Sequence, residues 1–188
     1  SRNGSVRKMA QLVGRGIETV NGMTARLRTV PAVSTVIEAA APDVPESGAP
    51  YVEQRDLEEC AGLALGSPTR FGNMAAPMKY FLDGLGGLWL RAAMAGKPAS
   101  VFTASSTMHG GQETTLISMM LPLMHQGMII VSLPYSEPGL WSTRSGGTPY
   151  GASHVAGVEN NLPLSDEERR LCIAQGRQLA TIAQKLAP

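Results

Sequence analysis

The sequence predicts an α/β protein in which a doubly wound parallel sheet carries helices on both faces. Short apolar runs alternate with segments of helical periodicity, as in parallel strands joined by right-handed helical crossovers. Two of these runs, 61–66 and 99–104, contain no charged residue, which is typical of strands buried on both faces. The 188 residues are enough for one core, and no linker or repeat divides them, so residues 1–188 are expected to form a single domain.

The first third of the chain combines a helix, a strand and a long irregular stretch. Apolar residues at helical spacing predict a helix over 5–21, and Gly22 is placed to end it. Partial alternation of apolar and polar residues predicts a strand over 24–30. Four prolines indicate a surface excursion over 31–55, and one short helical turn is expected over 56–60.

Two helices and a third strand accompany the buried strands. Residues 75–90 are expected to be helical, although three glycines weaken this helix. A helix rich in Met and Leu is predicted over 112–126, and because it is apolar nearly all round it must be buried on more than one side. The run MIIVSL predicts a strand over 128–133.

A second stretch rich in Gly and Pro, residues 134–163, precedes the last helix. Ser165 is expected to open this helix, with Glu168 three residues later completing a capping box. Apolar residues at helical spacing predict its buried stripe, which consists of Leu171, Leu179, Ile182, Ala183 and Leu186.

The beginning of the chain does not match the start of a doubly wound domain. Such a domain should open with a strand, whereas this chain opens with a loop and runs straight into a helix. Without an opening strand the sheet would lack a central member. We therefore expect an apolar strand ahead of residue 1, absent here through truncation or disorder.

Composition argues against several kinds of partner. Lys and Arg total 16 against 15 Asp and Glu, so a net charge of +1 gives no broad electrostatic footprint for nucleic acid. No apolar run approaches the roughly 20 residues of a membrane span. Cys60 and Cys172 form neither a CxxC pair nor a disulfide framework, which indicates a reducing, cytoplasmic setting and two small buried side chains. His109 and His154 lack metal-ligand spacing, so no metal site is expected.

Ligands of open α/β sheets bind beyond the carboxyl ends of the strands, and three loops occupy that position. Residues 1–6 bring hydroxyls, a glycine and a helix N-terminus together, which suits an anion, although Ser5 as an ordinary helix cap explains the pattern equally well. Residues 67–74 can flank a flat heterocycle, unless Asn73 merely caps the next helix. Residues 103–113 either let a planar ring approach the backbone or form a flexible surface loop.

Five motifs follow one another along the chain, namely PTRFGNM, GGLW, GGQET, HQGM and GGTPYGA. In this order they resemble the WrbA-type NAD(P)H:quinone oxidoreductases, which are flavodoxin-like, FMN-binding proteins. The resemblance extends from residue 1 to the final helix. It implies a flavodoxin-like five-stranded sheet whose short first strand precedes the phosphate loop, and a homotetramer built as a dimer of dimers.

The resemblance also implies a cofactor and its site. FMN is the implied cofactor, NADH or NADPH the electron donor and a quinone the acceptor. The residues implied to bind FMN come from the three loops, and they are Ser1, Arg2, Asn3, Gly4, Ser5, Val6, Pro68, Thr69, Arg70, Phe71, Gly72, Asn73, Thr103, Ala104, Ser105, Ser106, Thr107, Gly110 and Gly111. The third loop departs from the family in having Ser106 to His109 where glycine is more usual.

Three residues are implied to face the substrates. His125 matches the active-site histidine of the family, Trp89 matches an aromatic wall of the substrate pocket, and Asn3 is implied to lie near the nicotinamide. Considered without the resemblance, His125 is explained equally well as a histidine at a helix C-terminus that interacts with the helix dipole.

The leading hypothesis for function is a two-electron reduction of quinones to hydroquinones. A ping-pong mechanism is expected, in which NAD(P)H and the quinone use one flat pocket in turn beside the flavin. The alternative is a flavodoxin-type electron carrier without its own substrate, but a net charge of +1 argues against the acidic docking face of such carriers. A scaffold protein that has lost FMN is the third hypothesis.

Overall fold

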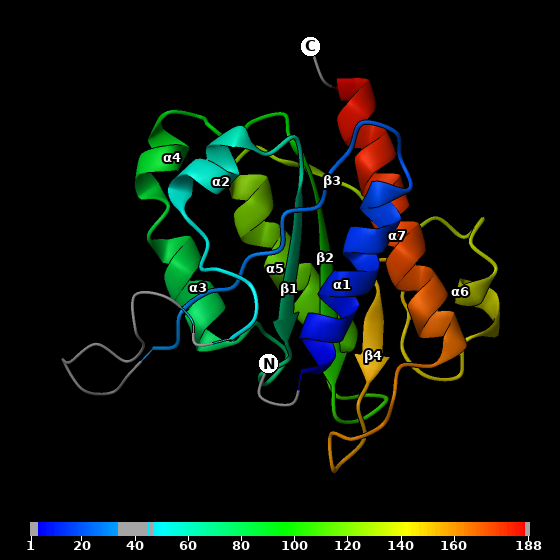
Figure 1. The fold of residues 1–188 in the computed structure, drawn as a ribbon. Coiled ribbons are helices and arrows are strands. Elements are labelled where there is room, and N and C mark those ends of the chain that lie inside the picture. The colour runs from blue at the N-terminus through cyan, green and yellow to red at the C-terminus, as the bar shows by residue number, and fades with distance from the viewer. Residues whose placement is uncertain (1–3, 34–44, 46, 187–188) are drawn as a thin grey trace.

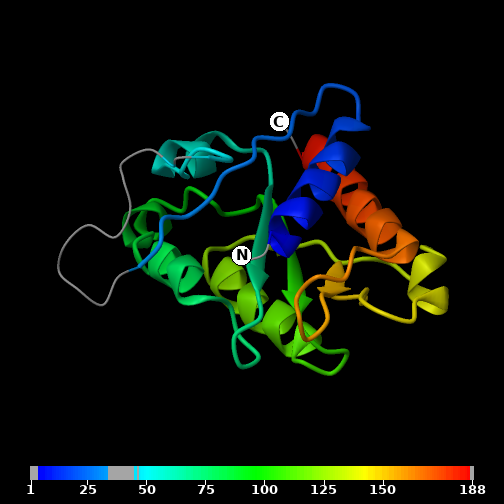
Figure 2. The ribbon, with the colours of Figure 1, turned by 60° about the horizontal axis from the view of Figure 1, so that its bottom comes forward.

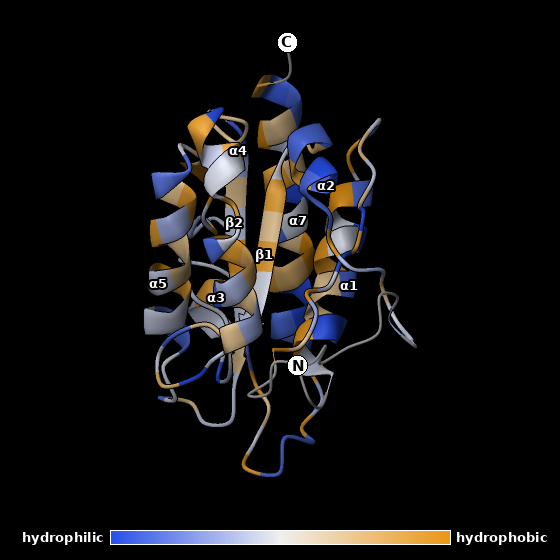
Figure 3. Ribbon diagram, turned by 90° about the vertical axis from the view of Figure 1, so that its left-hand side faces the viewer, coloured by the Kyte–Doolittle hydropathy of each residue, from blue (hydrophilic) through white to orange (hydrophobic). Residues whose placement is uncertain are grey.

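The computed structural model describes residues 4–33, 45 and 47–186, and it confirms the α/β architecture. A parallel sheet lies between two layers of helices (Figure 1; seen from the side in Figure 3). Helices α1 and α7 cover one face, and α3, α4 and α5 cover the other. The helices are α1 Ser5–Glu18, α2 Gln54–Glu59, α3 Ala76–Asp83, α4 Gly86–Leu90, α5 Gln112–His125, α6 Gly139–Ser142 and α7 Asp166–Leu186.

The sheet is organised around one central strand. Its strands are β1 Leu63–Pro68, β2 Pro98–Ser105, β3 Ile129–Ile130 and β4 Ser153–Val155. β1 pairs with one edge of β2, while β3 and β4 share the other edge at opposite ends. Every residue of β2 is buried, and its side chains alternate between the two helical layers. Val101 packs on the α3–α5 side, whereas Phe102 and Ala104 pack on the α1–α7 side.

The described residues form four strands, not the five implied by the resemblance. The strand predicted over 24–30 is wrong, because only Thr29 forms a bridge, to Tyr51, and a strand needs a continuous partner. The strand predicted over 128–133 is reduced to Ile129–Ile130. After the N–H of Val131 donates to the carbonyl of Ala99, the chain leaves β2, and β4 takes over that edge of the sheet.

The predicted helices form with three differences, of which the first is that α1 ends at Glu18 and not at residue 21, with Thr19 and not Gly22 following its last residue. The helix predicted over 75–90 is two helices, α3 and α4, because the chain turns at Gly84, whose N–H donates to the carbonyls of Tyr80 and Phe81. In α7, Leu186 is exposed and Ile182 is only half-buried, contrary to the predicted stripe. The end of this helix projects past the strands (Figure 1), where Ala183 is still buried but Leu186 is not.

Helices α1 and α7 lie side by side and pack with their backbones nearly in contact (Figures 1 and 2). A Cβ atom on Gly176 would lie 1.9 Å from the carbonyl oxygen of Val13. A Cβ atom on Gly16 would lie 2.0 Å from the carbonyl oxygen of Ile173. Since no side chain fits at either position, these two glycines set the distance between the helices.

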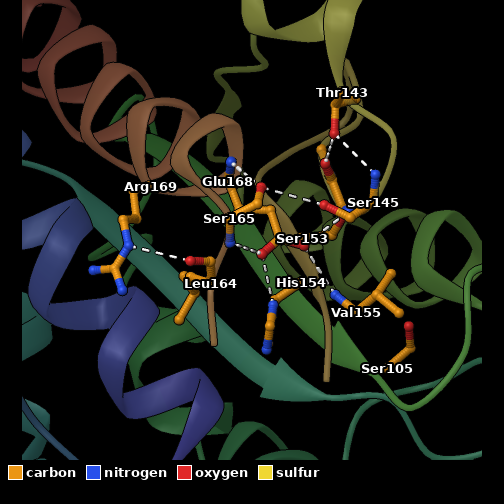
Figure 4. Close-up of polar contacts among 12 residues, drawn as sticks. Ser105, Thr143, Ser145, Ser153, His154, Val155, Leu164, Ser165, Glu168 and Arg169 are labelled. Atoms are coloured by element: carbon orange, nitrogen blue, oxygen red, sulfur yellow. Dashed lines mark hydrogen bonds and ion pairs between the residues drawn. The ribbon is translucent and has the colours of Figure 1, made fainter. Parts of the chain in front are cut away.

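The predicted capping box at Ser165 is confirmed, and Glu168 also joins three segments of the chain (Figure 4). Its buried carboxylate accepts the N–H of Gly146 at 2.8 Å, of Val155 at 3.1 Å and of Ser165 at 2.9 Å. The fourth donor is Nδ1 of His154, at 2.7 Å. Burial alone would raise the pKa of Glu168, but these hydrogen bonds outweigh it and lower the pKa below its ordinary value.

We expect Gly176→Ala to lower the free energy of unfolding by about 1–3 kcal/mol, even though alanine favours helix by about 1 kcal/mol. The added methyl group would force α1 and α7 apart, because the atom it meets is backbone. Urea unfolding measures the change. Gly86→Ala is the matched control, since a Cβ there meets nothing within 4 Å. Equal stability of the two variants would contradict the close approach of the helices.

We expect Glu168→Gln to lower the free energy of unfolding by about 3 kcal/mol at neutral pH, because an amide cannot accept all four hydrogen bonds. The lowered pKa means that this carboxylate stabilises the fold fully above pH 4.5, its ordinary pKa, and progressively less as the pH falls through its native value. When the free energy of unfolding is measured from pH 7 downward, the variant should lack the part of the pH dependence that comes from Glu168. Glu167→Gln, on the same turn, is the control and should change stability by only about 0.5 kcal/mol.

Candidate functional site

Strands β1, β2 and β4 end at the same edge of the sheet, and α1 and α7 begin there (Figures 1 and 2). This carboxyl edge is where open parallel sheets place their ligands. Two loops emerge from it, residues 69–75 after β1 and residues 106–111 after β2. The carboxyl edge is therefore the candidate site, as the sequence predicts.

The N-terminus of α1 presents backbone N–H groups at this edge. Gly4 is the N-cap, in the left-handed conformation with φ of 79°, and its carbonyl accepts the N–H of Lys8 at 2.9 Å. The interpretation of Ser5 as the cap is therefore wrong. No acidic residue lies in the first turn, so the positive end of the helix dipole is not neutralised there. Ser1, Arg2 and Asn3 lie outside the described residues.

The loop after β1 is a tight turn that displays an aromatic side chain. Arg70 and Asn73 exchange backbone hydrogen bonds of 2.7 and 3.0 Å, with Phe71 and Gly72 in the left-handed region between them. Phe71 is fully exposed in spite of its apolar ring. Asn73 does not cap α3, because its Oδ1 accepts the N–H of Met74 and the hydroxyl of Ser118. An exposed phenyl group in a strained turn is typical of a ligand-contacting loop.

The loop after β2 divides into a buried part and an exposed part. Thr103 is buried, and its hydroxyl donates to the carbonyl of Ser67 at 2.7 Å, so it joins β2 to β1. Ser105 is also buried and donates to the carbonyl of Thr107. Ser106 is exposed, and its hydroxyl donates a hydrogen bond to Oδ1 of Asn160 at 3.0 Å. Among the predicted residues of this loop, the exposed ones are therefore those free to meet a ligand.

The two loops meet at a pair of glycines. A Cβ atom on Gly111, the N-cap of α5, would lie 3.1 Å from Cα of Gly72. Thr69 and Thr115 reinforce the contact through a hydroxyl–hydroxyl distance of 2.6 Å. The structure thus brings the predicted residues of the second and third loops together at one edge.

Trp89 and His125 lie elsewhere on the chain. Their rings stack on one another, with centroids 5.7 Å apart and planes inclined by 24°. His125 ends α5, which starts at Gly111 on the carboxyl edge and has 14 residues. A helix of that length spans about 21 Å, so the stacked pair lies near the opposite edge of the sheet. Within one chain the structure does not bring Trp89 and His125 to the loops after β1 and β2.

The carboxyl edge also holds a cavity of about 290 Å³ beside the third loop. Met108, Arg144 and Leu162 line it, and Glu168 contributes to its wall. Sequence reasoning missed the role of His154, a buried histidine near this region that lacks the spacing of metal ligands. The capping-box signal did identify Glu168, but nothing in the sequence indicates which residue its carboxylate would meet.

Neither cysteine offers a reactive thiol. Burial raises the pKa of Cys172 to about 12, and burial also raises the pKa of the half-buried Cys60. In the part of the chain that the structure describes, no three His, Cys, Asp or Glu residues cluster as metal ligands would. None of the described helices is both long enough and apolar enough to cross a bilayer.

Known proteins share both the sequence and the fold. A family model described as NADPH-dependent FMN reductase matches residues 1–136. A protein of Solidesulfovibrio magneticus named NAD(P)H dehydrogenase (quinone) is 40% identical over 190 residues, covering 97% of this chain and 94% of its own. One of the same name from Syntrophobacter fumaroxidans is 42% identical over 193 residues, covering 99% and 95%.

The fold has a counterpart among solved structures. The crystal structure of a flavodoxin, WrbA-like protein from Agrobacterium tumefaciens superposes with a TM-score of 0.68 and 21% identity, covering 98% of this chain and 92% of that one. The flavodoxin-like fold and the resemblance to WrbA-type proteins are therefore confirmed. Because the family model matches well over half of its residues, the chain belongs to the NADPH-dependent FMN reductase family.

Proposed function

We propose that this protein is an FMN-dependent NAD(P)H:quinone oxidoreductase that reduces quinones to hydroquinones with two electrons. The observation that carries the proposal is the convergence, at the carboxyl edge, of the α1 N-terminus with the turn at Phe71 and the Gly72–Gly111 contact. Relatives 40–42% identical over nearly the whole chain and named NAD(P)H dehydrogenase (quinone) support the activity.

The residues at this edge fit a mononucleotide flavin. The first turn of α1, capped by Gly4, suits a phosphate group, and together with Ser1, Arg2, Asn3, Ser5 and Val6 it forms the proposed phosphate loop. The proposed ring-binding residues are Pro68, Thr69, Arg70, Phe71, Gly72 and Asn73, with Ser106, Thr107, Gly110 and Gly111 as the second wall. The buried residues Thr103, Ala104 and Ser105 support that wall from β2. One helix N-terminus accounts for one phosphate, which favours FMN over FAD. The bound flavin supplies the hydride chemistry, and NADH or NADPH is the donor.

We further propose a homotetramer in which a neighbouring copy completes the substrate slot. Trp89 and His125 are stacked near the far edge of their own sheet, so they can serve a flavin only on another chain. The surface beside them is apolar, since Ile117, Leu121 and Met124 are exposed on α5. Each chain is proposed to fold as a single domain and to work in the cytoplasm. A single flat slot serves donor and acceptor in turn, which corresponds to a ping-pong mechanism.

The purified full-length protein should be yellow, with the released cofactor running as FMN on chromatography. Addition of NADH or NADPH should bleach the visible absorption, and benzoquinone should restore it. Ser5→Asp is the control, because a carboxylate about 4 Å from the phosphate repels it by about 4 kcal/mol before screening and should empty the site. A colourless wild-type protein that takes up no added FMN, or recovery of FAD, would contradict the proposal.

Trp89 and His125 should affect different parts of the reaction. Trp89→Ala removes stacking area and should raise the Michaelis constants for NADH and quinone while FMN stays bound. His125→Ala should slow the quinone half-reaction more than the NADH half-reaction, because a positioned proton donor to the hydroquinone oxygen contributes about 10²–10⁴-fold. Stopped-flow absorption near the flavin band, roughly 450 nm, follows each half separately. Equal slowing of both halves would assign His125 a structural role.

A further inference from the structure

His154 carries a buried ring nitrogen that the fold leaves without a partner. The side chain is 1% exposed, and its Nδ1 is held by Glu168 at 2.7 Å. Its Nε2 is fully buried, and no residue that the structure describes supplies a hydrogen bond to it. Buried polar groups are almost always paired, because an unpaired one forfeits its hydration. An orphaned Nε2 therefore indicates a group that the described residues do not provide.

The register of the sheet places this ring on the face that α1 and α7 cover. Pro68, Ala104 and His154 are paired across β1, β2 and β4, and paired residues of a parallel sheet project from the same face. Ala104 packs in the core cluster that contains Val6, in the first turn of α1. His154 therefore lies on the face of the sheet that carries Ala104 and this core cluster. Figure 4 shows Nε2 on the far side of the ring from the Glu168 carboxylate.

The partner of Nδ1 determines what Nε2 can offer. Four hydrogen bonds keep the Glu168 carboxylate ionised, so Nδ1 bears the hydrogen that it donates. A protonated ring donates from both nitrogens, and a carboxylate on one side with an anion on the other balances its charge. The pair is therefore suited to an anionic group at the first turn of α1.

We propose that Nε2 of His154, oriented by Glu168, binds the terminal phosphate of FMN together with the first turn of α1. This inference rests on the proposed flavin site and adds to it a side-chain ligand from the distant strand β4. Two independent features converge on one anion, namely the N-terminus of the 14-residue helix α1 and a buried, unpartnered imidazole nitrogen. His154 would make the site selective for the phosphorylated flavin over riboflavin.

The test compares FMN with riboflavin, which lacks only the phosphate. Dissociation constants for both are measured by flavin fluorescence with the full chain, for the wild type, His154→Ala and His154→Gln. The ratio of the riboflavin dissociation constant to the FMN dissociation constant should fall about ten- to a hundred-fold in His154→Ala. A change of that size corresponds to the loss of one charge-assisted hydrogen bond. His154→Gln keeps an N–H near the position of Nε2 and should recover part of the ratio. Ser153→Ala, a buried neighbour on β4, is the control and should leave the ratio unchanged.

A second measurement does not depend on the stability of the variants. In the wild type, the ¹⁵N resonance of His154 Nε2 should shift when FMN or inorganic phosphate is added, and should stay in place with riboflavin. An unchanged ratio in His154→Ala, or an Nε2 resonance that ignores FMN, would overturn the role of His154 while leaving the flavin site intact. A wild type that binds neither flavin would instead overturn the proposed function itself.

Discussion

A single buried carboxylate holds the carboxyl edge of this protein together. Glu168 lies in the first turn of α7, yet its four donors come from the loop at Gly146, from β4 and from its own helix cap. β4 has only three residues, too few to define its position by pairing with β2 alone. An ionised carboxylate can remain in the interior only when all of its acceptor sites are used, so the loop, the strand and the helix must assemble together.

Close backbone contact between α1 and α7 holds the helical layer on one face of the sheet together. Gly16 and Gly176 let α1 and α7 approach until one helix meets the carbonyl groups of the other. Both helices therefore begin at the same edge, which brings the N-terminus of α1 to the side of the sheet where His154 lies. If His154 reaches that N-terminus, as we propose, the site offers an anion both backbone and side-chain donors, unlike a bare helix end.

The length of α5 separates two parts of the chemistry that sequence motifs place close together. GGQET and HQGM are neighbours along the chain, but the first caps α5 and the second ends it. A straight helix between them puts the Trp89–His125 stack and the loops at opposite edges of the sheet. A site that used both edges would need more than one copy of the chain, and the proposed tetramer would cover the exposed apolar residues of α5.

The sequence by itself determined the α/β class, the buried strands β1 and β2, the helices α1, α5 and α7 and the capping box, because each depends on local periodicity or local hydrogen bonds. Tertiary structure decided what depends on a partner. The segment 24–30 alternates like a strand, but only Thr29 forms a bridge. Only two residues of MIIVSL pair with β2, because β4 pairs with the remainder of that edge of β2. In the sequence His154 is an isolated histidine. The register of the sheet places it beside Ala104, and the packing of α7 brings Glu168 to its ring. A residue's type and spacing predict its local conformation, whereas what its side chain meets is settled only when distant segments pack.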